Sequence, residues 1–173
     1  MTLGKWIGFL CGTVLAIGGI SVASAEDYVI AAQTCVPDHT TLQNDEYQAN
    51  VSLSQKTGIT GQSQFYCPIP DEADSFIGNV FATFANTDSG GSYLTTVHLK
   101  RIDKDTGSVS LVDSIASNPF GNHTADVFVA DDSWDVTLDY AEYYYFLELE
   151  IDRPSSPLYT PKIYGIRLTS DNP

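Results

Sequence analysis

The sequence predicts a single all-β domain, an antiparallel β-sandwich or jelly roll, from three observations. Apolar and polar residues alternate along most of the chain, which is the period of strands with one buried face. Gly, Pro, Asp and Asn separate these runs at short intervals. No stretch shows the periodicity of an amphipathic helix, and neither a linker nor a repeat divides the chain.

Residues 1–25 have the pattern of a cleaved signal peptide. Lys5 precedes a short apolar segment, residues 7–20, and Ala23-Ser24-Ala25 forms a small-x-small cleavage site. The segment is short for a membrane span, so we expect no membrane insertion after cleavage; an uncleaved N-terminal anchor is the alternative. The predicted domain is therefore residues 26–173, in a secreted or periplasmic protein.

The domain is strongly acidic. Without Lys5, seven basic residues stand against 22 acidic ones, a net charge of −15. Phosphates and anionic lipids would repel such a chain, so the composition argues against nucleic acid and membrane surfaces as partners. It suits a soluble exported protein or one that meets cations.

Two cysteines remain once Cys11 leaves with the signal peptide. An even pair in an exported chain predicts a disulfide between Cys35 and Cys67. It would close a loop of about 32 residues and stabilise the fold by roughly 3–4 kcal/mol. A catalytic thiol is the alternative, but no histidine pattern supports it.

Ten runs are predicted as strands. The run 77–85 is apolar on both faces and predicts a central strand covered on both sides, whereas 37–46 and 131–133 are predicted as a loop and a turn. The predicted strands are residues 28–32, 51–54, 65–69, 77–85, 93–102, 108–115, 126–130, 134–140, 143–152 and 162–169.

Two hairpins are predicted. Residues 103–107 join strands 93–102 and 108–115, with Gly107 suited to positive φ. The last two runs are close enough to pair, and one register places Glu148 opposite Arg167. In the first hairpin, we expect the inward residues of the second strand to be Val109, Leu111 and Ile115.

Clustered acids raise the question of a metal. Asp131, Asp132 and Asp135 form one group, and the acids of residues 71–74 form another. Solvated turns are the simpler expectation; a structural calcium ion held by loop carboxylates is the alternative, with Asp131, Asp132 and Asp135 as its ligands. No other cofactor is expected.

No motif predicts catalysis. The three histidines are widely spaced, which is not the pattern of a zinc site, and no Gly-x-Ser-x-Gly elbow occurs. We therefore expect a non-catalytic protein, with a small carboxylate hydrolase as an open alternative.

Aromatic residues gather near the C-terminus. If the odd-numbered residues 147–151 face inward, Tyr144 and Phe146 lie on the other face with Glu148 and Glu150. Such rings commonly cover a sheet or pack in a core. The functional alternative is a surface where rings stack on sugars and carboxylates accept from hydroxyls. The candidate binding residues are Trp134, Tyr144, Phe146, Glu148 and Glu150.

The Cys-x-Pro of residues 35–37, the Cys67-Pro68-Ile69-Pro70 segment and the Tyr-rich closing strands resemble a set of small secreted bacterial proteins with no known activity. The resemblance implies a disulfide-tied β domain and brings no site residues with it.

The predicted function is therefore that of a surface binding module for a glycan or an extracellular protein. The alternative is a structural subunit of an extracellular fibre or surface layer, which should carry an alternating donor segment. Two N-glycosylation sequons begin at Asn50 and Asn122 and matter only in a secreting eukaryote.

Overall fold

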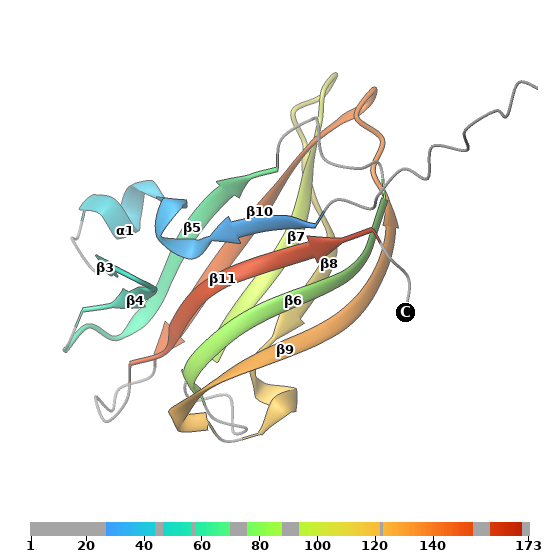
Figure 1. The fold of residues 1–173 in the computed structure, drawn as a ribbon. Coiled ribbons are helices and arrows are strands. Elements are labelled where there is room, and N and C mark those ends of the chain that lie inside the picture. Colours follow the sequence, from blue (N-terminus) through green and yellow to red (C-terminus); the bar gives the residue numbers. More distant parts are fainter. Residues whose placement is uncertain are drawn as a thin grey trace, which may run out of the picture.

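Two antiparallel sheets pack face to face in the computed structural model (Figure 1). It describes residues 27–43, 47–56, 58–69, 76–87, 94–121, 123–153 and 160–170. The predicted signal peptide, the acids of residues 71–74 and Asn122 lie outside these ranges. The two sheets confirm the all-β sandwich that alternation and turn spacing predict.

The first sheet has six strands in the order β3-β4-β11-β6-β9, with β1 also paired to β11. β4 pairs with the start of β11 and β1 with its end. The bounds are β1 Tyr28–Ala31, β3 Tyr47–Ala49, β4 Leu53–Gln55, β6 Phe76–Thr87, β9 His123–Thr137 and β11 Lys162–Thr169.

The second sheet has five strands in the order β2-β5-β10-β7-β8. Its centre is β10, which pairs along most of its length with β5 and β7. The bounds are β2 Val36–Pro37, β5 Gly61–Pro68, β7 Leu94–Asp103, β8 Val109–Ala116 and β10 Tyr143–Arg153.

The core lies between the inner faces of the two sheets. Alternate residues of each strand point into it, as the period of two requires. The predicted disulfide is confirmed: Cys35 and Cys67 are joined beside this core. Residues of the core with no more than 1% of their surface exposed include Leu53, Phe65, Phe84, Val97, Leu99, Leu147, Leu149, Ile151, Ile163 and Ile166.

The first predicted hairpin is confirmed. β7 pairs with β8, and Gly107 in the turn has a φ of 70°. The Asp103 carboxylate accepts hydrogen bonds from the backbone N–H groups of Asp105 and Thr106, which explains why this Asp-rich segment turns. The central position of β6 is also confirmed, although its outer face is only partly covered: Phe81 and Thr83 are half-buried.

The predicted closing hairpin is wrong. β10 belongs to the five-stranded sheet and β11 to the six-stranded sheet, so Glu148 lies opposite Tyr66 and His98, and Arg167 lies opposite Val29 and Phe81. Alternation marks which face of a strand is buried. It does not specify the sheet to which the strand belongs, because both sheets of a sandwich share one core.

The predicted turn at residues 131–133 is also wrong. β9 continues through these residues, and Asp131 and Asp132 pair with Phe81 and Val80 of β6. The irregularity comes one step later, where the register shifts and Asp135 has a φ of 44°. A β-bulge bends the strand here without ending it.

The predicted inward orientation of β8 is wrong for the first part of the strand, because of a second bulge. Ile115 is buried as expected, but Val109 and Leu111 are each 57% exposed. The register shifts between Leu99 and Lys100, so that Asp113 pairs with Leu99 while Leu111 pairs with Lys100. The extra residue on β8 reverses the alternation and turns the start of the strand outward.

The predicted loop 37–46 contains a short helix, α1, His39–Gln43. The carboxylate of Asp38 accepts a 2.7 Å hydrogen bond from the backbone N–H of Thr41, which caps the helix start. Across the described ranges, no helix is long and apolar enough to cross a membrane.

Candidate functional site

The candidate site is the outer face of the five-stranded sheet. Directly paired residues of neighbouring strands share a face, so the register defines rows of side chains across it. In one row, Val36, Tyr66, Glu148 and His98 follow one another from β2 to β7. The next row, from β5 to β8, consists of Pro68, Phe146, Lys100 and Leu111. A third row runs from Tyr144 through Ile102 to Val109.

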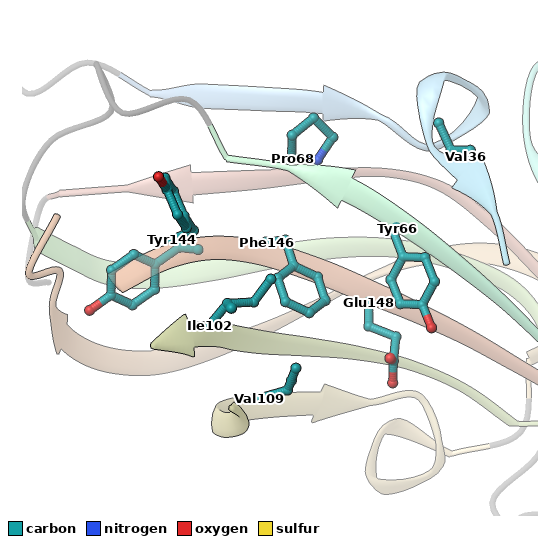
Figure 2. A pocket seen from close by; sticks show the side chains of 9 residues that line it. Val36, Tyr66, Pro68, Ile102, Val109, Tyr144, Phe146 and Glu148 are labelled. Carbon is teal, nitrogen blue, oxygen red and sulfur yellow. The ribbon is translucent and has the colours of Figure 1, made fainter. Parts of the chain in front are cut away.

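Residues of all three rows line an open groove of about 610 Å³, while His98, Lys100 and Leu111 lie outside its lining. Figure 2 shows Phe146 near the middle, with Tyr144 toward one end and Tyr66 and Glu148 toward the other. Tyr145 of β10 also lines the groove, and the remaining lining residues are apolar and come from four strands. They are Val36, Pro68, Ile102 and Val109.

The rings in the groove contact one another and keep exposed surface. Tyr66 and Phe146 meet edge to face with ring centroids 5.8 Å apart. Tyr144 is 52% exposed, and the ammonium of Lys104 lies 4.5 Å from its ring centroid. The Lys104 ammonium also donates to the Tyr140 carbonyl. The Lys104 ammonium therefore makes a cation–π contact with the Tyr144 ring, about half of which stays open to solvent.

Charged groups lie at the other end of the face. Lys100 Nζ is 2.6 Å from Glu148 Oε1, and the Glu148 side chain is only 7% exposed. His98 Nε2 lies 3.7 Å from Glu150 Oε2. Each of the two carboxylates thus has a basic neighbour on β7, as a buried or half-buried charge requires.

Two groups of this face have shifted pKa values. The neighbouring His98 imidazole is the main reason that the pKa of Glu150 is lowered, and it outweighs the opposing effect of burial. Burial, followed by the negative charges of Glu148 and Asp38, raises the pKa of Tyr66. A phenol is already protonated near neutral pH, and the raised pKa keeps the Tyr66 hydroxyl a hydrogen-bond donor at higher pH as well.

Four of the five predicted binding residues share this face. Tyr144, Phe146 and Glu148 line the groove, and Glu150 lies just beyond it on the same strand face. Trp134 does not belong there: it is 4% exposed and packs in the core from β9 of the other sheet. Trp134 alternates with polar residues in the sequence, and this pattern indicates a side chain that points into the core.

Sequence reasoning missed the residues that β2, β5, β7 and β8 contribute. Tyr66 directly follows a buried residue in an alternating run, and His98 and Lys100 share the polar face of their own strand. These local signals predict that the side chains face outward. Only the register, however, brings Tyr66, His98 and Lys100 beside β10.

The predicted calcium ligands lie elsewhere. Asp131, Asp132 and Asp135 are exposed along β9, where successive strand residues point to opposite faces. They do not form a group whose ligand atoms converge within 4.8 Å. Calcium binding by the chain stays a prediction. Of the two sequon asparagines, Asn50 is exposed.

No protein-family model and no curated protein matches the sequence. Several solved structures show low similarity. The CBM22-2 xylan-binding domain from Paenibacillus barcinonensis Xyn10C has 8% identity and a TM-score of 0.44, with 87% of this chain and 89% of that chain covered. The K2 cleaved adhesin domain of Lys-gingipain has 14% identity and a TM-score of 0.40, with 83% and 90% covered.

A family two carbohydrate esterase from Cellvibrio japonicus also has 14% identity and a TM-score of 0.40. The match covers 85% of this chain but only 34% of that chain, so this protein spans about a third of the esterase structure. Similarities at this level carry no argument on function, which rests instead on the groove itself.

Proposed function

We propose that this protein is a non-catalytic, exported binding module that holds a neutral polysaccharide on the outer face of the five-stranded sheet. The observation that carries the proposal is the groove in which Tyr66, Phe146 and Tyr144 present ring surface beside the Glu148 carboxylate. Rings cover the C–H faces of sugars, and the carboxylate and the Tyr66 hydroxyl hydrogen-bond to sugar hydroxyls.

The charges of the face favour a neutral ligand. Lys100 and His98 are engaged by Glu148 and Glu150, and the chain as a whole is strongly acidic. A uronic acid or sulfated glycan would meet repulsion without a cation reserved for it. The Cys35–Cys67 disulfide supports export, because such bonds persist in oxidising compartments.

The test is isothermal titration with soluble xylan, β-glucan and mannan, using polygalacturonate as the acidic comparison. We expect binding of at least one neutral polymer, weakened about tenfold or more by Phe146→Ala, which corresponds to roughly 1.4 kcal/mol. Val129→Ala is the matched control, because Val129 is 56% exposed on β9 in the other sheet. Binding that Phe146→Ala leaves intact would remove the groove from the proposal.

A protein partner on the same face is the second candidate. Leu111 of the edge strand β8 is 57% exposed and extends the apolar surface beyond Val109, which lines the groove. Leu111→Ala separates the two candidates: it should weaken a protein complex that spans the patch and leave glycan affinity unchanged. The fibre-subunit alternative stays a prediction, tested by sedimentation for concentration-dependent polymers.

A further inference from the structure

Three side chains that commonly ligate metals meet beside the groove. His98 of β7 pairs directly with Glu148 of β10, and Glu150 lies two residues further along the same face. One ligand atom of each lies within 4.8 Å of the other two. Within the described ranges, no other group of three or more His, Cys, Asp or Glu residues has this property.

The geometry is close to that of a bound ion. A tetrahedral zinc ion with bonds of about 2.1 Å holds its ligand atoms roughly 3.4 Å apart. His98 Nε2 and Glu150 Oε2 are 3.7 Å apart, so both can ligate with little movement. All three residues stand on paired central strands, which fix their backbone positions better than loops would.

The buried carboxylate already requires a cation. Glu148 is more than nine-tenths buried, and the Lys100 ammonium now neutralises it at 2.6 Å. Lys100 is partly exposed at the end of a flexible stem, so its ammonium can move into water when another cation takes its place. The Nε2 atom of His98 already faces the Glu150 carboxylate, so an ion between them would take the place of this contact without reorienting the ring.

We propose that His98, Glu148 and Glu150 bind one divalent transition-metal ion, with zinc as the best match, in exchange for the Lys100 ammonium. An imidazole with two carboxylates suits zinc better than calcium, which prefers oxygen ligands alone. Three protein ligands leave a fourth position for water or a ligand oxygen. The site is distinct from the predicted calcium ligands and shares only Glu148 with the groove lining.

The test is titration of the disulfide-bonded chain, purified without a histidine tag, with Zn²⁺, and with Co²⁺ followed by visible absorption. We expect one ion per chain. His98→Ala and Glu150→Gln should each weaken binding at least tenfold, because each removes a ligand. Glu142→Gln is the matched control: Glu142 is exposed in the turn before β10, and its substitution should change nothing.

Lys100→Met tests whether the metal ion takes the place of the Lys100 ammonium at Glu148. It should tighten zinc binding several-fold, because no ammonium then competes for Glu148. Absence of one-to-one binding, or binding that both ligand variants leave unchanged, would overturn the site. A weaker or unchanged affinity in Lys100→Met would overturn the exchange. Apo-protein melting of each variant checks folding, and because no glycan is present, failure here leaves the groove proposal standing.

Discussion

Trp134 and Phe146 are both aromatic residues of alternating runs, yet their surroundings are opposite. Trp134 packs in the core, whereas Phe146 lies on the outer face of its sheet. Trp134→Ala should therefore lower the free energy of unfolding by about 3–5 kcal/mol, as cavity formation does. The affinity of the folded fraction for glycan should not change. Urea unfolding and titration of the same sample measure both, and a loss of affinity without loss of stability would contradict this assignment.

Glu150 couples stability to pH. Its pKa in the folded protein lies below the ordinary value of 4.5, mainly because of the His98 imidazole. The stabilisation is therefore present above about pH 4.5 and is lost as pH falls through the lower, folded-state pKa. Glu150→Gln should flatten the fall of the urea midpoint between about pH 5 and pH 3.

Asp38 and Asp103 also have lowered pKa values. The wild type and Glu150→Gln both contain them, so part of the loss of stability in acid should remain in the variant. An acid profile of Glu150→Gln that runs parallel to that of the wild type would show that the His98–Glu150 pair contributes nothing measurable.

The sequence predicts which side chains of one strand share a face, but it does not predict which residues of other strands lie beside them. Alternation correctly places Tyr144, Phe146, Glu148 and Glu150 on one face, because side-chain direction within a strand is a local property. The partners of these residues depend on register and strand order, which involve segments far apart in the chain. His98, for example, faces Glu148 although the two are 50 residues apart in the sequence and the segment between them shows no shared pattern.

At the scale of elements, a single bulge in β8 determines which of its apolar side chains are buried. Leu111 is 57% exposed and Ile115 is 2% exposed, although both fall on the same side of a simple alternating pattern. Ile115→Ala should cost about 2–5 kcal/mol of unfolding free energy, whereas Leu111→Ala should stay within about 0.5 kcal/mol of the wild type. Chemical unfolding of the two variants checks this, and equal losses would mean that β8 is not bulged.

Bulges and sheet changes are the features that sequence patterns predicted least well. Residues 131–133 have the composition of a turn, yet pairing with β6 on one side holds them in a strand. The bulge that follows places Asp135 at positive φ, a conformation that Asp tolerates better than most residues. Turn composition thus correctly indicated a backbone irregularity here, but not whether the chain reverses.

At the scale of the whole molecule, the fold class follows from the sequence because it depends on many weak signals that agree. The assignment of strands to sheets does not, since consecutive β10 and β11 lie in different sheets. A sandwich of this kind places residues of distant segments side by side. Its fold class is therefore easier to predict than its site.

The disulfide acts at this same scale. Cys35 stands where the chain passes from β1 of one sheet to β2 of the other, and Cys67 belongs to β5. The bond closes a separation of 32 residues, so the chain-entropy model gives a loss of roughly 3–4 kcal/mol for a Cys35→Ala, Cys67→Ala double variant. The melting temperature should fall by roughly 10 °C.

Reductant provides the matched comparison. It should lower the melting temperature of the wild type toward that of the double variant, and it should leave the double variant unchanged, because only the Cys35–Cys67 bond is then affected. A wild type that melts equally with and without reductant, after mass spectrometry shows that the bond is broken, would mean that core packing alone fixes the crossing between the sheets.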